Sequence, residues 1–183
     1  MIGIDNSFDM LDMALEREDD RILYLMQDMR EFEPGEKVSA VVSACDSINY
    51  ILEPEDLQAV FFCVSESLKE GGIFIFDINT PYKYEVLMAD NTIAENRDEG
   101  SFIWDNYYDE ESSNNEYELA VFVRNEDGTF DRFEEEHYQH GFTLEEVSDA
   151  VKKAGLKIRN VYDAFSHNAP DDNSERLYYI IEK

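Results

Sequence analysis

The chain begins with a short apolar segment that ends in an acidic residue. Residues 1–5 are predicted to form a β-strand that ends in Asp5, and Asn6 or Ser7 can cap a helix directly after it. In doubly wound α/β proteins such a strand presents its last carboxylate to a ribose, about 20 residues after a glycine-rich turn. No glycine-rich turn precedes this strand. We therefore predict an α/β protein in which the first strand and its loop are missing.

The next segments alternate between strands and helices. The first helix is expected to carry an apolar stripe, formed by Phe8, Leu11, Ala14 and Leu15. Strands are predicted at residues 22–26, 40–45 and 73–78, and the last two have the unbroken apolar character of buried parallel strands. Between these two strands, Pro54 suits the first turn of a helix that Gly71 and Gly72 end.

After Thr80 the apolar residues recur with period two. Residues 102–108, 117–125 and 129–139 are predicted to be antiparallel strands, and Asp127-Gly128 is a hairpin signal between the last two. We expect residues 82–140 to form an inserted β cover over the substrate side of a single, partial domain that spans residues 1–183.

Helix signals return beyond the insert. Thr143 and Glu146 form a capping box, and Gly155 stands just past the end of the helix that they begin. Residues 156–162 and 177–181 then supply two closing strands.

The charge of the chain limits its partners. A formal net charge of -28 weighs against nucleic acid and against anionic membrane surfaces, because both require clustered Lys and Arg. No apolar run approaches a membrane span of roughly 20 residues and no signal peptide is evident, so we expect a cytoplasmic protein. Residues 95–136 contain 15 acidic and three basic residues. A solvated acidic face is the favoured interpretation, and a surface that selects a cationic substrate or partner is the alternative.

The cysteines and histidines do not indicate a metal site or a disulfide framework. Cys45 and Cys63 both lie in apolar sequence surroundings, and two cysteines do not make a disulfide scaffold. The three histidines and two cysteines show no ligand spacing, so we expect no metal.

Four stretches together resemble the class I S-adenosylmethionine-dependent methyltransferases that act on small molecules. They are similar to the family's second strand and helix, third strand, fourth strand and approach to the fifth strand, at residues 2–11, 25–32, 41–50 and 68–77. The closing helix and strand pair resemble the family's reversed last hairpin. The resemblance implies a Rossmann-like doubly wound sheet with an antiparallel β insert, and S-adenosylmethionine as the cofactor.

The same resemblance implies a set of cofactor-binding residues. Asp5 would hold the ribose hydroxyls, with Asn6 and Met10 beside it, and Asp28 would accept from the adenine amino group while Met29 packs on the ring. Cys45 and Asp46 would lie at the end of the strand beneath the methyl donor. Simpler readings remain open for the acids: a surface strand-end acid for Asp5, a capping or loop acid for Asp28, and a turn acid for Asp46. A covalent thiolate at Cys45 lacks its Pro-Cys context, and a buried strand cysteine is the preferred interpretation.

The departure from the family concerns its first strand and the E-x-G-x-G-x-G loop that follows. Both would have to lie before Met1. In the family's strand order, 3-2-1-4-5-7-6, loss of strand 1 leaves two interior edges unpaired, and each orphaned backbone group costs about 1 to 3 kcal/mol. We therefore expect a truncated reading frame, unless another chain supplies the strand, and self-association through the unpaired edges.

Residues at or just beyond the strand ends are candidates for the acceptor side. They are Asn49, Tyr50, Asp77 and Asn79, at positions where α/β folds place ligands. His137, Tyr138 and His140 stand at the return from the insert, and a histidine there could act as general base for an oxygen or nitrogen nucleophile. The simpler interpretation is that the first four are polar loop residues without a role and that the histidines lie on the surface. Because nucleic-acid motifs and a basic groove are absent, a small molecule is the expected methyl acceptor.

Two other classes of protein remain open at this point. A nicotinamide-dependent oxidoreductase would also use Asp5 on a ribose, but the reversed last hairpin and the β insert argue against it. The second alternative is a non-catalytic remnant or acidic interaction module with a broken cofactor site.

Overall fold

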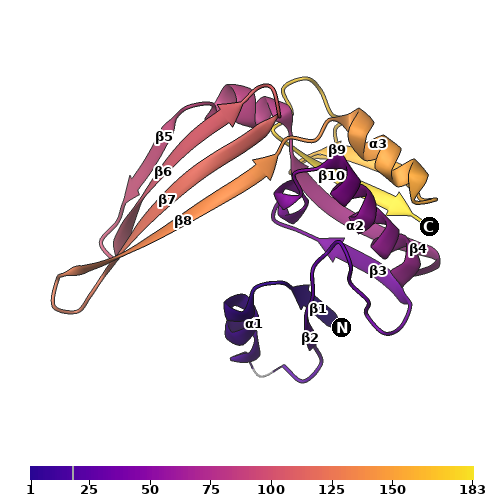
Figure 1. Cartoon of the computed structure of the whole chain (residues 1–183), viewed down its shortest axis with the longest axis horizontal. Coiled ribbons are helices and arrows are strands. Elements are labelled where there is room, and N and C mark those ends of the chain that lie inside the picture. The colour runs from indigo at the N-terminus through magenta and orange to yellow at the C-terminus, as the bar shows by residue number, and fades with distance from the viewer. Residues whose placement is uncertain (18) are drawn as a thin grey trace.

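The computed structural model describes residues 1–17 and 19–183 and contains three sheets (Figure 1). The central sheet is built from β3 (Val38–Ser43), β4 (Leu68–Asn79), β10 (Arg176–Glu182) and β9 (Lys157–Asp163), in that spatial order. β3 runs parallel to β4, whereas β10 is antiparallel to both of its neighbours. This arrangement confirms the α/β sheet with a reversed last hairpin.

Two helices bury the core against the central sheet. They are α2 (Pro54–Ser67) and α3 (Leu144–Lys153). Phe61 of α2 meets Phe74 and Phe76 of β4 edge to face, and Phe76 stacks on Tyr179 of β10 with ring centroids 4.7 Å apart. Aromatic pairs of this kind add to the burial of their apolar area. The capping box at Thr143 and Glu146 is confirmed, because both reciprocal bonds are present.

The helix that starts at Pro54 ends earlier than the sequence indicated. α2 stops at Ser67, and the chain passes directly into β4 because Leu68 is extended and fully buried. Gly71 and Gly72 therefore lie within the strand. There the Gly71 amide donates to the Lys183 carbonyl and the Lys183 amide donates to the Gly72 carbonyl, so the glycines join the end of the chain to the sheet.

The N-terminal segment forms a separate small unit, which consists of β1 (Ile2–Asp5), α1 (Phe8–Leu15) and β2 (Leu23–Met26). β1 and β2 pair in parallel, with Asp5 opposite Met26. Ser7 caps α1 as expected, since its hydroxyl accepts from the Met10 amide. The apolar stripe of α1 is not buried: Phe8 is 69% exposed, and no residue of the helix is buried. Within the described residues, β1 pairs only with β2 and β3 only with β4.

The prediction of a buried Cys45 is wrong. β3 ends at Ser43, and Cys45 lies exposed in the turn beyond it. Cys45 and Asp46 both adopt positive φ values, 62° and 50°, which take the chain out of the strand direction and into the 3₁₀-helix η1 (Ser47–Tyr50). β3 itself is only partly covered, and Val42 is 67% exposed.

The insert forms an antiparallel four-stranded sheet that projects from the body as an arm (Figure 1). After the single π-helical turn η2 (Lys83–Met88), its strands are β5 (Thr92–Asn96), β6 (Gly100–Asp109), β7 (Asn114–Arg124) and β8 (Phe130–His140). The hairpin at Asp127-Gly128 is confirmed, with Gly128 at φ 84°. β5 was not predicted, because all five of its residues are exposed and they show no clear alternation.

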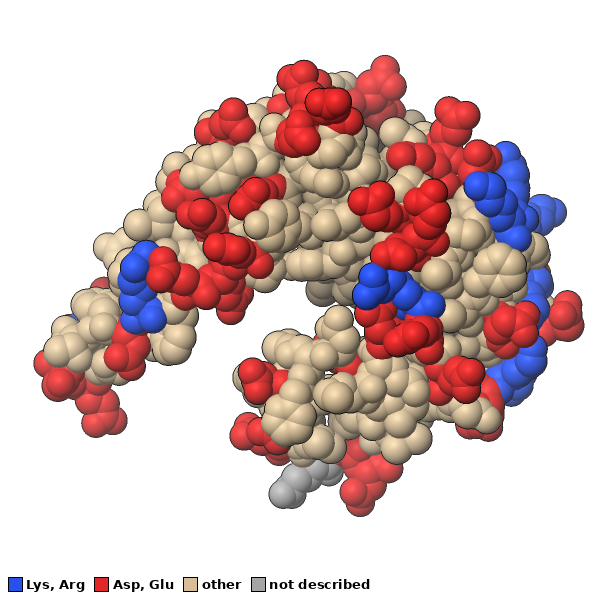
Figure 2. Space-filling view, viewed as in Figure 1, with Lys and Arg blue, Asp and Glu red and all other residues tan. Residues whose placement is uncertain are grey.

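The two faces of the arm differ in composition. Cross-strand rows that contain Trp104, Leu119, Tyr117 and His137 form one face, and the alternate rows place Glu116, Glu118, Glu134 and Glu136 on the other. Figure 2 shows acidic side chains scattered along the arm, with few basic ones. None of the helices in the described parts of the chain has the length and apolar character needed to cross a membrane.

Candidate functional site

The carboxyl ends of β3 and β4 meet the base of the arm, and most of the predicted acceptor-side residues lie there. The left-handed turn at Cys45 and Asp46 directs η1 toward β8. Consecutive non-glycine residues with positive φ are uncommon, and such strain persists only where the surroundings hold it. Two sets of polar side chains surround this turn.

The first set centres on Arg176, at the start of β10. Its guanidinium contacts Asp46 at 2.5 Å and Asp77 at 2.9 Å, and its Nε donates to Asn79 Oδ1 at 3.0 Å. Asp77 also accepts from the Asp46 backbone amide at 3.1 Å. Because the Asp77 side chain is only 5% exposed, Arg176 supplies the charge that compensates its burial.

Asn49 and Asn79 are buried, and the Asn49 side chain connects backbone segments through hydrogen bonds. The Asn49 amide group donates to the carbonyls of Asn79 and His140 and accepts from the Asn79 backbone amide, at 3.0, 2.8 and 2.9 Å. Asn49 is fully buried and Asn79 is 2% exposed. These contacts connect η1, β4 and β8, so the hydrogen-bonding capacity of Asn49 is directed at the backbone. A substrate-binding role for either residue stays a prediction.

Tyr84 and Gln139 extend this network into the arm. The Tyr84 hydroxyl donates to Gln139 Oε1 at 2.9 Å, and Gln139 Nε2 donates to Asp46 Oδ2 at 2.9 Å. Lys83 donates to Asn79 Oδ1 at 3.0 Å. Burial raises the pKa of Tyr84, and burial followed by the nearby Arg176 charge lowers the pKa of Lys83.

The second set is a row of aromatic and acidic groups. The Tyr50 hydroxyl lies 3.0 Å from the Tyr117 hydroxyl and 2.9 Å from His137 Nδ1, and His137 Nε2 lies 3.0 Å from Glu135. Tyr117 stacks on the His137 ring with centroids 4.5 Å apart. Burial raises the pKa of both Tyr50 and Tyr117, so both hydroxyls keep their protons at neutral pH.

The structure separates His137 from the other two candidates on the same strand. Tyr138 and His140 lie on the opposite face of β8, because side chains alternate along a strand. The Tyr138 hydroxyl donates to Glu116, and His140 Nδ1 contacts Asn114 Oδ1 at 2.8 Å. His140 is 6% exposed, and this burial lowers its pKa. His137 alone of the three shares a cluster with Tyr50.

The residues expected to bind the nucleoside lie in and just beyond the N-terminal unit. Asp5 Oδ1 accepts from the Ser7 amide at 2.8 Å at the end of β1. Asp28, which follows β2, pairs with Arg30 at 2.7 Å, and this contact lowers the pKa of the Asp28 carboxyl. Met29 packs against the core, whereas Asn6 and Met10 are exposed. Their roles remain predictions.

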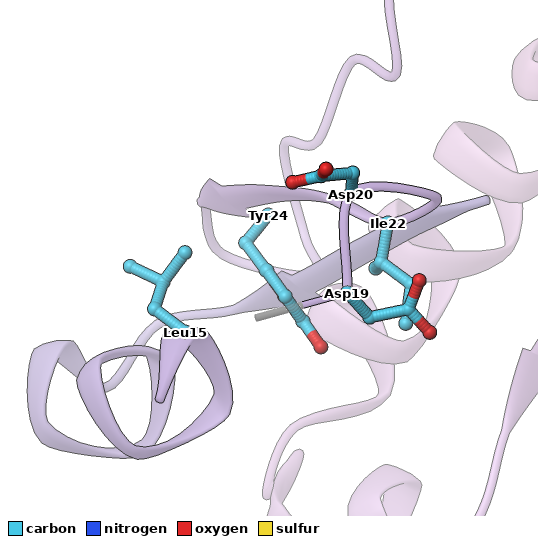
Figure 3. A pocket seen from close by; sticks show the side chains of 5 residues that line it. All are labelled: Leu15, Asp19, Asp20, Ile22 and Tyr24. Atoms are coloured by element: carbon cyan, nitrogen blue, oxygen red, sulfur yellow. The ribbon is translucent and has the colours of Figure 1, made fainter. Parts of the chain in front are cut away.

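Two hollows on the described surface lie away from these clusters. One, of about 370 Å³, lies beside the end of α1 and is lined by Leu15, Asp19, Asp20, Ile22 and Tyr24 (Figure 3). The other, of about 360 Å³, is lined by residues 32–37 together with Glu66 and Ser67. Neither hollow is lined by a residue that the sequence predicted to bind cofactor or acceptor.

Six groups in the clusters were not found from the sequence: Lys83, Tyr84, Tyr117, Glu135, Gln139 and Arg176. A signal existed for Tyr117, because the hairpin centred on Asp127 places residue 117 opposite residue 137. Arg176 had no local signal, since its acidic partner Asp46 lies 130 residues away in sequence.

Comparisons with known proteins agree on one family, although no family model matches the chain. A protein of Geobacillus sp. (strain WCH70) named "Putative methyltransferase" is 32% identical over 184 residues, which cover 99% of this chain and 74% of the relative. An N,N-dimethyltransferase of Streptomyces venezuelae, whose name gives dTDP-3-amino-3,4,6-trideoxy-α-D-glucopyranose as its substrate, is 35% identical over 50% of this chain and 37% of its own length.

The fold comparison leads to the same family. The crystal structure of an S-adenosylmethionine-dependent methyltransferase from Clostridium acetobutylicum ATCC 824 superposes with a TM-score of 0.92 at 28% identity, covering 99% of this chain and 74% of that one. These similarities do not favour the oxidoreductase or the non-catalytic remnant. The chain belongs to the S-adenosylmethionine-dependent methyltransferases.

Proposed function

We propose that the chain transfers a methyl group from S-adenosylmethionine to the amino nitrogen of a small molecule, bound where η1 meets β7 and β8. The observation that carries this proposal is the cluster of Tyr50, Tyr117 and His137. It joins the end of the β3 turn to the base of the arm by contacts of 2.9 and 3.0 Å. In open α/β sheets, ligands bind outside the carboxyl ends of the strands, which is where this cluster lies.

The residues of the N-terminal unit suit the nucleoside half of the cofactor. Asp5 is the last residue of β1 and Asp28 comes two residues after β2, its parallel partner, so both carboxylates are near one edge of the sheet. Carboxylates there can accept from ribose hydroxyls and from an adenine amino group. S-adenosylmethionine supplies a methyl group on a positively charged sulfur. The chain has to place the acceptor in line with that methyl group and receive the acceptor's proton.

A nitrogen acceptor is supported by the relative that acts on an amino sugar. It is also supported by the Glu135 carboxylate beside His137, which favours a cationic amine over an anion. His137 is the proposed general base. The arm would cover the acceptor, with residues 82–140 acting as the β cover. A cytoplasmic location, the exclusion of nucleic acid and self-association remain predictions from the sequence.

The test combines binding with turnover. Calorimetric titration with S-adenosylhomocysteine should detect binding that Asp5→Asn weakens. Mass spectrometry after incubation with S-adenosylmethionine and dTDP-3-amino-3,4,6-trideoxy-α-D-glucopyranose should detect a methylated product, formed about 100-fold more slowly by His137→Gln. Binding of S-adenosylhomocysteine without product would contradict the amino-sugar acceptor, and absence of binding would contradict the cofactor site.

A further inference from the structure

Tyr117, Tyr50, His137 and Glu135 form a hydrogen-bonded row at the base of the arm. The donor and the acceptor in each of its contacts can be derived from the chemistry of the four side chains. An ionised carboxylate only accepts hydrogen bonds, so the contact between Glu135 and His137 Nε2 requires a proton on Nε2. When the imidazole is neutral, Nδ1 carries no proton and must accept from the Tyr50 hydroxyl. The single hydroxyl hydrogen of Tyr50 is then committed to His137.

The direction extends to Tyr117. Because Tyr50 has given its hydrogen to His137, the contact between the two hydroxyls requires Tyr117 to donate to Tyr50. The Tyr117 oxygen is left with lone pairs and no hydrogen of its own to give, so it can accept a further hydrogen bond. When His137 is protonated instead, both of its ring nitrogens donate, so Tyr50 must accept from Nδ1. The Tyr50 hydroxyl then donates to Tyr117, and the Tyr117 hydroxyl is free to donate a hydrogen bond to another group. The row therefore has two opposite polarities, which differ by one proton.

The two ends of the row differ in exposure. Tyr117 is 8% exposed at the inner end, whereas the Glu135 side chain is 59% exposed at the outer end. Between them, Tyr50 is 43% exposed and the His137 side chain is 23% exposed. Tyr117 and Tyr50 come from β7 and η1, while His137 and Glu135 come from one face of β8. A row that changes polarity on gaining a proton, and that connects a buried hydroxyl to a surface carboxylate, has the properties of a proton relay.

We propose that Tyr117, Tyr50, His137 and Glu135 form a relay that carries the acceptor's proton from the methyl-transfer site to the surface, so that His137 acts on the acceptor only through the two tyrosines. This inference rests on the proposed function. The acceptor nitrogen bonds to the methyl carbon as the carbon–sulfur bond breaks and its electron pair stays on sulfur. The nitrogen passes a proton to the Tyr117 oxygen, the Tyr117 proton passes to Tyr50, and the Tyr50 proton passes to His137. The proton on Nε2 then leaves through Glu135 to water, and the row is reset when the imidazole returns to its Nε2–H form through water and the two hydroxyls rotate back.

The first test needs neither cofactor nor acceptor. Long-range proton–nitrogen NMR spectra of the histidine-labelled chain, recorded at about pH 8 where an ordinary imidazole is neutral, report which ring nitrogen carries the proton. We expect the Nε2–H form for His137. The internal control is His140, whose Nδ1 faces the Asn114 carbonyl oxygen and is expected to carry the proton. Spectra of His137→Gln and His140→Gln assign the signals. A proton on Nδ1 of His137 would overturn the relay, since Tyr50 could not then donate to it.

The second test uses turnover with dTDP-3-amino-3,4,6-trideoxy-α-D-glucopyranose as the probe acceptor. Tyr50→Phe and Tyr117→Phe should each lower kcat by about 100-fold with little change in KM. Glu135→Gln should lower kcat while keeping the Nε2–H form. Tyr107→Phe, on the other face of the arm, is the matched control and should leave kcat unchanged. Full kcat in the two cluster variants would overturn the relay. An absence of turnover in the wild-type chain would refute the proposed acceptor and leave the NMR result to decide the relay.

Discussion

The residues proposed to bind the cofactor and those proposed to bind the acceptor are held in place in different ways. In and just beyond the N-terminal unit, Asp5 accepts from the Ser7 amide and Asp28 pairs with Arg30, each only two residues away in sequence. Arg30 also pairs with the more distant Asp56 at 2.8 Å, on an exposed surface. On the acceptor side, Arg176 reaches Asp46 across 130 residues, and Asn49 reaches His140 across 91. The local contacts are mostly exposed, whereas the distant ones are mostly buried. The comparison indicates that the geometry of the acceptor side depends on the whole fold, while that of the N-terminal unit depends mainly on neighbouring residues.

The largest change in the free energy of unfolding is expected for a substitution of Arg176. Arg176→Ala leaves the carboxylates of Asp46 and Asp77 without their cationic partner, and removal of one member of a buried ion pair costs about 3 to 5 kcal/mol. Urea unfolding should show a fall of this size in the free energy of unfolding, with a smaller fall for Arg176→Lys. Arg30→Ala is the control from the exposed side and should barely move the unfolding midpoint. An equal fall in the free energy of unfolding for Arg176→Ala and Arg30→Ala would show that the buried and the exposed ion pairs do not differ in their contribution to stability.

The next effect is expected at Asn49. Asn49→Ala removes three hydrogen bonds and leaves the backbone groups of Asn79 and His140 buried without partners. Because an unsatisfied buried group costs about 1 to 3 kcal/mol, the free energy of unfolding should fall by about 3 kcal/mol in the same urea measurement. Asn6→Ala, in the exposed N-terminal unit, is its matched control. Equal stability of the two variants would contradict the conclusion that the Asn49 side chain stabilises the fold by bonding the backbone of Asn79 and His140.

A smaller effect on stability is expected when either of two hydroxyl helix caps is removed. Thr143 caps α3, which packs Val147 and Val151 into the core, and Ser7 caps α1, which buries no side chain. Loss of a cap costs about 1 kcal/mol of helix stability. Thr143→Ala should therefore lower global stability by about 1 kcal/mol, whereas Ser7→Ala should speed hydrogen exchange in α1 alone. A global fall from Ser7→Ala would show that the N-terminal unit unfolds together with the body.

The smallest effect is a pH dependence on the acceptor side. Burial lowers the pKa of His140 below its ordinary value of 6.5, so the unfolded chain binds this proton more readily than the folded chain. The contribution to stability is therefore complete above about pH 6.5 and declines as the pH falls below it. The stability difference between the wild type and His140→Gln should increase from about pH 5 to about pH 8. A pH-independent difference would show that His140 does not titrate in this range. His167→Gln, which changes an exposed histidine, is the control.

Local sequence patterns predicted most of the secondary structure. The capping box at Thr143 and the turn at Asp127-Gly128 depend on contacts within a few residues, so the sequence displays them directly. The closing strands appear as apolar segments in the sequence, although β10 pairs with β4 from a distant part of the chain. The predictions failed where a distant contact overrode the local signal. Gly71 and Gly72 resemble a helix end, but the buried Leu68 starts β4 before them, and their partner is Lys183 at the other end of the chain.

The candidate site was predicted in part for the same reason. Tyr50, Asp77 and His137 were found because they stand at or near strand ends, where ligands commonly bind. The alternation of side chains along β8 is also a sequence property, and it already places His137 and Tyr138 on opposite faces. Cys45 was misplaced because its apolar surroundings gave no sign that the chain would adopt a left-handed turn there.

The sequence by itself determined the family, the α/β alternation, the acidic arm and the candidates at the strand ends, because these follow from composition, periodicity and motifs. Only the tertiary structure decided that Arg176 joins Asp46 and Asp77, and that the Tyr50 hydroxyl contacts both Tyr117 and His137. The physical reason is that both clusters join segments far apart in the chain, so no local pattern in the sequence displays them.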